Sequence, residues 1–175
     1  MNKQRLFIYL LFVVLLFAGG AYLLKTDSPS SVPSVTITQP TASDSAELAV
    51  VKRVIDGDTI ELSDGRRIRY IGVDTPELHH PTKPVQCFGK EAMEENKKLV
   101  EGKTIKMTKD VSETDKYKRL LRYVWVNSVF VNEYLAKEGY AHQATFPPDV
   151  KYAELFRKAA EEARLKNKGL WNSCK

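Results

Sequence analysis

The stretch IDGDTIELSDGRRIRYIGVDTPE, residues 55–77, decides the fold. Two runs with the alternating apolar pattern of a strand, residues 59–62 and 66–73, flank a short polar segment that contains Asp64 and Gly65. An Asp-Gly dipeptide suits a tight turn because glycine tolerates positive φ. We therefore predict a β-hairpin whose two ends return to the same edge of a sheet.

The ends of this hairpin carry acidic residues. Asp58 precedes the first strand and Asp74 follows the second. A turn centred on the Asp-Gly dipeptide places Asp58 opposite Ile71, only about 10 Å along the strand from Asp74. Local curling of the chain at Asp56 would close that gap. We therefore expect the two aspartates to meet at one place.

Outside the hairpin, strand patterns alternate with helical spacing. We predict further strands over residues 48–54, 104–108 and 120–126. We predict helices over residues 91–100 and 131–138. Five strands with a helix between the third and the fourth indicate a small closed barrel. The expected fold is α+β: a five-stranded OB-like β-barrel flanked by three α-helices.

The third of these helices shows the clearest pattern. Apolar residues at helical spacing form one stripe, with lysines, arginines and glutamates on the other face: Tyr152, Leu155, Phe156, Ala159 and Ala163. Asp149 is the expected N-cap of this helix. Gly169 is the expected stop at its C-terminal end.

The chain has 175 residues, which we divide into three parts. A signal anchor or signal peptide covers residues 1–25, a Ser/Thr/Pro-rich linker covers 26–46, and a domain covers 47–175. The uncharged apolar run in the first part follows basic residues. It is long enough to cross a bilayer with the N-terminus in the cytoplasm. The linker cannot bury enough apolar surface to offset its chain entropy, so we expect a flexible spacer.

Cleavage of the N-terminal segment is the alternative to anchoring. Small residues occupy positions 18–21, as a signal peptidase requires. We favour an anchor because the apolar residues Tyr22, Leu23 and Leu24 continue past them. Either interpretation exports the domain. We therefore expect an extracytoplasmic protein that is membrane-anchored through this segment or secreted.

Net charge says little by itself about the partner. The sequence carries 27 Lys and Arg against 22 Asp and Glu, a formal net charge of +5, with a pI near 9.1. This balance favours polyanionic partners, although solvated lysine-rich helices produce the same balance.

Cys87 and Cys174 are the two cysteines of the sequence, and both lie in the part that we expect to be exported. An oxidising compartment favours a bridge between them. We predict a disulfide that ties the C-terminal tail to the loop before the first helix. Two free thiols are the alternative. Metal ligation is disfavoured because neither cysteine has a nearby Cys or His partner in the sequence.

The acidic residues and the arginines together indicate phosphate chemistry. Asp58 and Asp74 offer oxygen ligands, which suit a hard cation such as Ca²⁺. A cation held by two carboxylates keeps positions for water and substrate, and it can neutralise a phosphate oxygen. Glu77 could accept the proton of that water. Arg69 and Arg119 present planar, always-charged forks to phosphate oxygens.

Four motifs occur in one order along the sequence: DGDT at 56–59, Arg69, VDTPE at 73–77 and DKYKR at 115–119. On these motifs the chain resembles the staphylococcal nuclease family over about residues 50–171. The resemblance implies an OB barrel with three helices and Ca²⁺-dependent hydrolysis of DNA and RNA phosphodiesters. It further implies an endonuclease that cleaves the 5′ P–O bond and leaves 3′-phosphates. We expect single-stranded substrates to be favoured, and a monomer with no protein partner.

The resemblance also implies roles for single positions. The metal ligands would be Asp58, Asp74 and the backbone carbonyl of Thr75, with Asp56 close behind them. The catalytic positions would be Arg69, Glu77 and Arg119. The loop residues Lys116 and Tyr117 would contact the terminal phosphate of the nucleotide.

Two positions depart from the family pattern. Lys118 stands where family members often carry glycine. The staphylococcal enzyme presents two tyrosines to the nucleotide, whereas Phe146 is the one Phe, Tyr or Trp within residues 141–148. Phe146 is therefore the expected base contact.

A binding module is the competing interpretation. An OB-fold at the cell surface could hold nucleic acid without cutting it. We favour the enzyme because every acidic and arginine position of the family pattern is present. We interpret His79, His80 and His142 as non-catalytic.

Overall fold

The computed structural model of the chain describes residues 46–78, 82 and 84–174. The predicted N-terminal segment over 1–25 and nearly all of the predicted linker over 26–46 lie outside these residues. Within the described part, no helix combines the length and the apolar character needed to cross a membrane.

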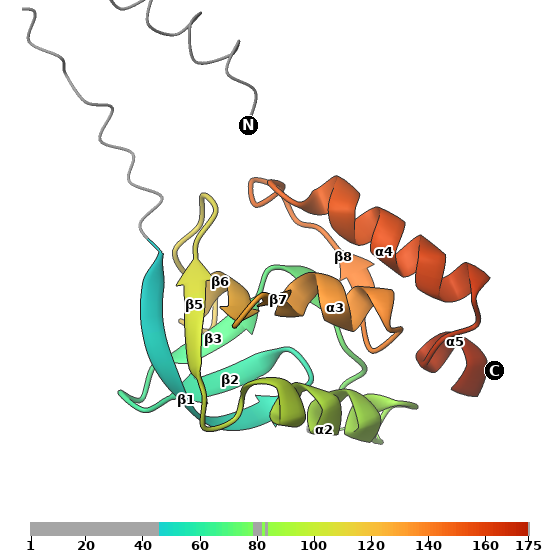
Figure 1. Ribbon diagram of the computed structural model, residues 1–175, viewed down its shortest axis with the longest axis horizontal. Coiled ribbons are helices and arrows are strands. Elements are labelled where there is room, and N and C mark those ends of the chain that lie inside the picture. The colour runs from blue at the N-terminus through green and yellow to red at the C-terminus, as the bar shows by residue number, and fades with distance from the viewer. Residues whose placement is uncertain (1–45, 79–81, 83, 175) are drawn as a thin grey trace, which may run out of the picture. The chain divides into compact units, whose positions relative to one another are not determined.

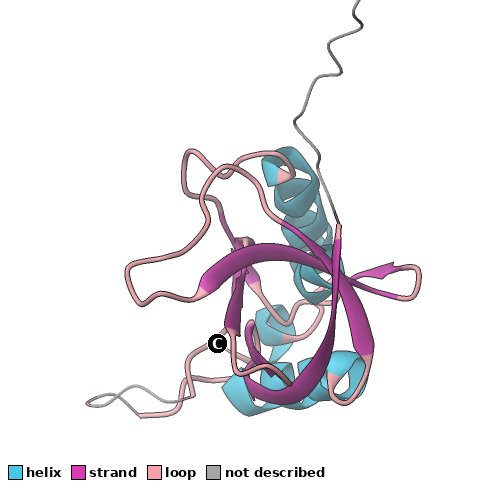
Figure 2. Ribbon diagram, turned by 90° about the vertical axis from the view of Figure 1, so that its left-hand side faces the viewer, coloured by secondary structure: helices cyan, strands magenta, loops and turns pink. Residues whose placement is uncertain are grey.

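Five strands close into a barrel. They are β1 (Glu47–Asp56), β2 (Thr59–Leu62), β3 (Arg67–Tyr70), β5 (Thr104–Thr108) and β6 (Leu120–Val126). Neighbouring strands pair antiparallel, except that β3 pairs with β6 in parallel and thereby closes the barrel. Figure 2 shows these strands curling around one another with the helices outside them. The closed five-stranded barrel is consistent with the predicted OB-fold.

The long strand β1 belongs to both sides of the barrel. Its first residues pair with β5, and its later residues pair with β2. Register shifts between Val51 and Arg53 and between Val54 and Asp56 mark irregularities of the bulge type. Such irregularities bend and twist a strand, which helps β1 to curl around the barrel.

Helices cover the barrel on its outside. They are α2 (Gly89–Val100), α3 (Val131–Lys137), α4 (Ala153–Leu165) and a fourth, short helix, α5 (Leu170–Ser173). Figure 1 shows α2 along the lower edge of the barrel and α3 between the strands and α4. The structure confirms the three predicted helices within a few residues at their ends and adds α5.

The core lies inside the barrel and under the helices. Its fully buried large side chains come from every barrel strand, and examples are Val51, Ile60, Ile68, Ile105 and Tyr123. Each such burial contributes about 1.5–3 kcal/mol. The helix α2 adds Ala92 and Val100, and its buried Asn96 accepts a 3.0 Å hydrogen bond from the hydroxyl of Tyr70.

The predicted hairpin exists, but its register differs by one residue from our prediction. Thr59 faces Arg69, and the N–H of Tyr70 donates to the carbonyl of Asp58 at 2.9 Å, so Asp58 does not lie opposite Ile71. The connection is the cause: it has three residues and ends at Gly65, whose φ is +88°. Three-residue hairpin loops commonly place glycine at this left-handed position.

The strand predicted over residues 66–73 is broken after Tyr70. Gly72 has a φ of +81°, and a Cβ at this position would lie 2.4 Å from the ring of Phe156 on α4. The chain therefore leaves the barrel here and forms the short strand β4 (Gly72–Asp74). This strand pairs with β8 (His142–Ala144). A further short strand, β7 (Val129–Phe130), pairs antiparallel with β6. The change of direction brings the residues after Val73 back toward Asp58.

Both predicted ends of the last helix are wrong. Tyr152, not Asp149, is the N-cap of α4, and it makes no side-chain cap. Asp149 is buried and accepts hydrogen bonds from the N–H groups of Val111 and Ser112, at 3.0 and 2.8 Å. It therefore stabilises a loop that is distant in the sequence.

At its other end, α4 stops at Leu165 and Gly169 begins α5 instead. A Cβ at Gly169 would lie 2.3 Å from the carbonyl oxygen of Gly139. Glycine is needed here for a close backbone crossing. Leu155, predicted to be in the apolar stripe, is 36% exposed, and Ala160 is buried instead.

Candidate active site

Asp58 joins the hairpin to the segment after β4. Asp58 is only 4% exposed. Its Oδ2 accepts hydrogen bonds from the N–H of Thr75 at 2.7 Å and from the Thr75 hydroxyl at 3.0 Å. A Cβ at Gly57 would lie 2.6 Å from this hydroxyl, so the DGD turn can approach Thr75 closely only with glycine at its centre. The turn thus brings together two segments that the hairpin separates in sequence.

Arg69 on β3 bridges both aspartates. Its Nε lies 3.2 Å from Oδ1 of Asp58, and its Nη2 donates to Oδ1 of Asp74 at 2.6 Å. Its Nη1 donates to the backbone carbonyls of Tyr70 and Val73, at 2.9 and 2.7 Å. With five donors in a planar fork, an arginine can hold all these acceptors at once, which a lysine could not.

Negative charge is concentrated at this place. Burial and the nearby charge of Asp58 raise the pKa of Asp56 to about 7. Burial also raises the pKa of Asp74, although the charge of Arg69 opposes the shift. A bound cation would favour the charged forms of these carboxyls.

Arg119 is held at the end of a tight turn. Its backbone N–H and its Nε donate to the carboxylate of Asp115, at 2.9 and 2.7 Å, and its Nη1 donates to the hydroxyl of Thr59 at 3.3 Å. Burial raises the pKa of Asp115, but the hydrogen bonds from Arg119 outweigh it, so that this pKa lies below its usual range. Within the same turn, Lys118 has a φ of +62°, which is the conformation that glycine favours.

Glu77 reaches the site from the segment before α2. The backbone of Glu77 is bound to Gln86: its N–H donates to Oε1 of Gln86 at 2.8 Å, and its carbonyl accepts from the N–H of Gln86 at 2.9 Å. These two bonds fix the backbone that carries the carboxylate.

One small cavity brings the predicted residues together. Its volume is about 130 Å³, and its lining consists of Asp56, Asp58, Arg69, Asp74, Thr75, Pro76, Glu77 and Arg119. All three predicted metal ligands and all three predicted catalytic residues are among them. Two arginines and four acids therefore line one volume of the size of a few water molecules.

A larger, mainly apolar cavity of about 570 Å³ shares both arginines with the small one. The predicted nucleotide contacts Lys116, Tyr117 and Phe146 line it. Tyr117 and Phe146 are 67% and 74% exposed, so their rings are accessible at its rim. The guanidinium of Arg119 lies 5.4 Å from the ring centroid of Tyr117. The arrangement offers charge at one end and apolar or aromatic surface at the other.

The donor set fits a hard cation. Asp58 and Asp74 carry carboxylate oxygens, and Thr75 in the same lining has a backbone carbonyl, an oxygen of the type that Ca²⁺ accepts. Within the described residues, no group of three or more His, Cys, Asp or Glu side chains could hold a metal by itself. A cation here would depend on two carboxylates, a carbonyl and water.

Sequence reasoning missed two residues that hold Arg119 and Glu77 in place. Asp115 was part of a motif, but no role was predicted for it, and Gln86 was not considered. An aspartate at the start of a tight turn is a recognisable signal, because its carboxylate accepts from backbone N–H groups two or more residues later. No comparable local signal identifies Gln86, because its partner is nine residues away.

Comparisons with known proteins agree with this geometry. Residues 67–173 match the family model described as staphylococcal nuclease homologue. The chain is 44% identical to a thermonuclease of Staphylococcus intermedius over 128 residues, which is 71% of this chain and 76% of the relative. It is 42% identical to a thermonuclease of Staphylococcus hyicus over 126 residues, 70% of this chain and 75% of the relative. It is also 40% identical to the endonuclease YncB of Bacillus subtilis over 125 residues, 69% of this chain and 59% of the relative.

Proposed function

Because the chain belongs to the staphylococcal nuclease family, we propose that this nuclease hydrolyses phosphodiester bonds of DNA and RNA with Ca²⁺ as its metal. The bond between phosphorus and the 5′ oxygen breaks, and the products end in a 3′-phosphate and a 5′-hydroxyl. One observation carries the proposal: four carboxylates and two arginines line a single small cavity. Acids alone would repel a phosphate diester, whereas acids facing guanidinium groups suit a cation and a phosphate together.

Asp58, Asp74 and the carbonyl of Thr75 would hold the Ca²⁺, with Asp56 behind them. When bound, the ion supplies charge that neutralises a phosphate oxygen and orders water. The support for this assignment is the oxygen-only donor set of the cavity and the grouping of several carboxyls in one place. Burial first, and then the charge of Asp58, raises the pKa of Asp56 and of Asp74, and a bound cation would offset both effects.

The two arginines of the cavity lining bind the phosphate. Arg69 and Arg119 are both anchored by carboxylates, so their guanidinium planes are held before substrate arrives. Donors that are already in position stabilise the charge that develops on phosphate oxygens in the transition state. Removal of one such donor typically costs about 10²–10³ in kcat.

Glu77 acts as the general base. It accepts a proton from the attacking water while the oxygen of that water bonds to phosphorus and the 5′ oxygen departs. Its place in the lining of the small cavity, on a backbone bound twice by Gln86, supports this role.

Nucleic acid extends from the small cavity into the large one. Lys116 and Tyr117 contact the terminal phosphate, and the exposed ring of Phe146 stacks on a base. Base stacking on an aromatic ring contributes about 1–3 kcal/mol per base and tolerates any sequence. It requires unpaired bases, so single-stranded substrates are favoured.

The enzyme acts outside the cytoplasm. The disulfide between Cys87 and Cys174 supports export, because such bonds persist in oxidising compartments. The apolar N-terminal sequence supports a membrane tether, with cleavage and secretion as the alternative.

Digestion of plasmid DNA and of RNA by the purified full-length chain tests the proposal. We expect cleavage with Ca²⁺, none after chelation, and products with 3′-phosphate ends. Glu77→Gln and Arg119→Lys should each lower kcat by about 10² or more while circular dichroism stays unchanged. Arg157→Lys is the matched control, since this arginine pairs with Glu154 and Glu161 on the exposed face of α4.

Binding without any product in the presence of several divalent metals would favour the alternative, a nucleic-acid-binding module that does not cleave. The complete set of acids and arginines in the cavity argues for the enzyme. Full activity of both site variants would exclude the roles given to Glu77 and Arg119.

A further inference from the structure

Gln86 binds both polar groups of the Glu77 backbone. Its side-chain Oε1 accepts from the N–H of Glu77 at 2.8 Å, and its own N–H donates to the carbonyl of Glu77 at 2.9 Å. The pair closes the ends of the segment between them. The backbone of Glu77 can therefore neither rotate nor shift without breaking a bond to Gln86.

The chain that follows Gln86 holds this residue in place. The carbonyl of Gln86 accepts from the N–H of Gly89, the first residue of α2, at 3.1 Å. A Cβ at Gly89 would lie 2.9 Å from the carbonyl oxygen of Pro76 and 3.3 Å from that of Glu77. The start of α2 thus packs directly on the backbone that leads into Glu77.

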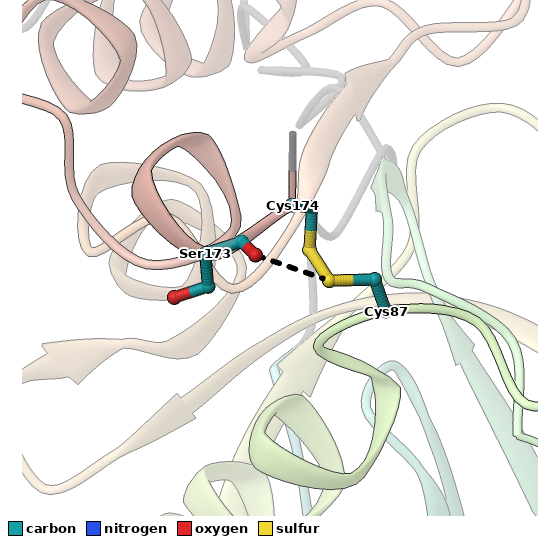
Figure 3. The surroundings of a disulfide bond; sticks show 3 residues. All are labelled: Cys87, Ser173 and Cys174. Atoms are coloured by element: carbon teal, nitrogen blue, oxygen red, sulfur yellow. Dashed lines mark hydrogen bonds between the residues drawn. A yellow bond between two sulfur atoms is a disulfide. The ribbon is translucent and has the colours of Figure 1, made fainter.

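A disulfide secures the same segment from the other side. Cys87, the neighbour of Gln86, is bonded to Cys174, with the two Cα atoms 5.8 Å apart (Figure 3). The dashed line in Figure 3 joins Sγ of Cys87 to the carbonyl oxygen of Ser173 at 3.7 Å. A disulfide sulfur has no proton to donate, so this is a contact that packs the bridge against the end of α5. The bridge therefore ties the segment that positions Glu77 to the C-terminal end of the domain.

We propose that Gln86 is a positioning residue for Glu77 and that the Cys87–Cys174 bridge holds Gln86 in place, so that turnover depends on the redox state of the bridge. The inference rests on the proposed function, because it concerns the carboxylate to which we assign the general base. A displacement of about 1 Å in a catalytic group can cost 10²-fold in rate. Loss of the backbone bonds to Gln86 permits a shift of that size.

Opening the bridge requires a reductant. A dithiol supplies two electrons and two protons, the S–S bond breaks, Cys87 and Cys174 become thiols, and the dithiol becomes a cyclic disulfide. In this state Cys87 has no covalent tie to the C-terminal tail, so its neighbour Gln86 moves more and its bonds to the backbone of Glu77 open more often. We expect an enzyme that is most active in its oxidised form.

Substitutions at position 86 separate positioning from general stability. Gln86→Met has a similar volume but no acceptor for the N–H of Glu77, whereas Gln86→Glu keeps an acceptor oxygen. In the full-length chain we expect Gln86→Met to lower kcat by about 10- to 100-fold with KM within about twofold. We expect Gln86→Glu to retain most of the turnover that Gln86→Met loses.

A double-mutant cycle with Glu77→Gln tests whether Gln86 acts through Glu77. If it does, Gln86→Met changes the remaining activity of Glu77→Gln by less than about twofold. An equal loss in both backgrounds would show that Gln86 acts elsewhere, and no loss in the wild-type background would also overturn the proposal. Absence of cleavage by the unmodified chain would instead overturn the proposed function and this inference with it.

The redox part has its own test. We compare kcat of the oxidised chain with that of the chain reduced by dithiothreitol, at a temperature where circular dichroism shows both to be folded. We expect kcat to fall several-fold on reduction. The Cys87→Ser, Cys174→Ser double variant should have the kcat of the reduced chain, and dithiothreitol should not change it. Equal kcat before and after reduction would exclude a role of the bridge.

Hydrogen exchange supplies a readout that does not depend on activity. The amide proton of Glu77 is bonded to Gln86, so it should exchange slowly in the oxidised chain. We expect faster exchange in Gln86→Met and after reduction, whereas the amide of Val124, bonded to the buried Asn132, should be unchanged. Unchanged protection of Glu77 in both cases would overturn the proposal even if a variant were too unstable for kinetics.

Discussion

At the scale of single residues, Lys118 shows what a side chain costs in an unfavourable conformation. It occupies the left-handed region with a φ of +62° in the turn that carries Arg119. Asp115 maintains this turn by accepting from the N–H groups of Tyr117 and Arg119, both at 2.9 Å. Glycine would adopt this conformation without the steric cost. The turn ends at Arg119, which lines the small cavity.

Replacement of Lys118 by glycine should stabilise the domain slightly. The left-handed conformation costs an L-residue roughly 1–2 kcal/mol, and the extra chain entropy of glycine offsets about 0.5–1 kcal/mol of the gain. We expect an increase of up to about 1 kcal/mol in the free energy of unfolding, measured in urea. Asn127 has a φ of +53°, which asparagine tolerates, so Asn127→Gly should gain nothing. A larger gain for Asn127→Gly than for Lys118→Gly would contradict this account.

The acids and arginines of the small cavity were more predictable than the residues that fix the surrounding backbone. Asp58, Asp74 and Arg69 are grouped in sequence by one hairpin, so their meeting follows from topology. The observed roles of Gln86 and Asp149 depend instead on hydrogen bonds to residues 9 and 38 positions away. Local pattern contains no information on such contacts.

At the scale of elements, two glycines allow the end of α3 to cross the start of α5. A Cβ at Gly139 would lie 2.4 Å from the carbonyl oxygen of Lys168, and one at Gly169 would lie 2.3 Å from that of Gly139. The N–H of Leu170 donates to the carbonyl of Gly139 at 2.9 Å across this crossing. The position of α5, and with it that of Cys174, depends on the absence of side chains here.

Gly139→Ala should therefore destabilise the domain more than its positive φ alone explains. Gly65→Ala is the matched control, because Gly65 also has a positive φ, of +88°, but no atom within 4 Å of a Cβ. Both variants lose about 1–2 kcal/mol from the backbone conformation. Gly139→Ala should lose a further 1–3 kcal/mol, roughly, from overpacking. If Gly139→Ala and Gly65→Ala lose the same unfolding free energy in urea, the backbone crossing at Gly139 relaxes to accept the Cβ without cost.

A second element-scale feature is the ion-pair group between β1 and β2. The carboxylate of Glu61 on β2 accepts from Lys52 at 2.8 Å and from Nη2 of Arg53 at 2.7 Å. The hydrogen bond from Arg53 and then that from Lys52 lower the pKa of Glu61 to about 2, against the opposing effect of burial. The folded state therefore binds this proton less readily than the unfolded state, whose glutamate pKa is about 4.3.

The pH dependence of stability should reveal this group. A lowered pKa in the folded state contributes stability that is present above about pH 4.3 and is lost as the pH falls toward about 2. Glu61→Gln should thus be less stable than the wild type near pH 7, and the difference should shrink between these two pH values. Urea unfolding at a series of pH values measures it. A difference that stays constant down to pH 2, roughly the folded-state pKa, would assign the loss to packing and not to charge.

Most elements were predictable, and the exceptions have physical causes. The strands Thr59–Leu62, Thr104–Thr108 and Leu120–Val126 match the predicted ranges, because their alternation is bounded by clear turn residues. The break at Gly72 has no local signal that we used, because the close contact at this glycine is with the ring of Phe156, on a helix far along the chain. The one-residue register error came from the loop length, which the Asp-Gly dipeptide alone does not determine.

At the scale of the whole molecule, the disulfide is a long-range constraint. It joins residues 87 positions apart. In the chain-entropy model, closing a loop of this length stabilises the folded state by about 4–5 kcal/mol, mainly by restricting the unfolded chain. It reinforces a barrel whose core is modest in size.

Removal of the bridge should lower stability substantially without changing the barrel. We expect the Cys87→Ser, Cys174→Ser double variant to lose about 2–5 kcal/mol of unfolding free energy in urea. Reduced wild type should behave in the same way, and reductant should have no effect on the double variant. A loss below 1 kcal/mol, roughly, would mean that the unfolded chain is already compact around this pair.

The parallel pairing of β3 with β6 has a consequence for the folding of this nuclease. This pairing joins strands from the two halves of the domain. The two arginines of the small cavity lie on its two sides, Arg69 in β3 and Arg119 just before β6. Such non-local contacts form slowly, because the entropy of closing the intervening chain is lost before any contact compensates for it. A chain in which this pairing has not formed keeps the two arginines on separate segments, so the small cavity that they line together is incomplete. With the proposed function, the return of cleavage during refolding should therefore follow the closure of the barrel.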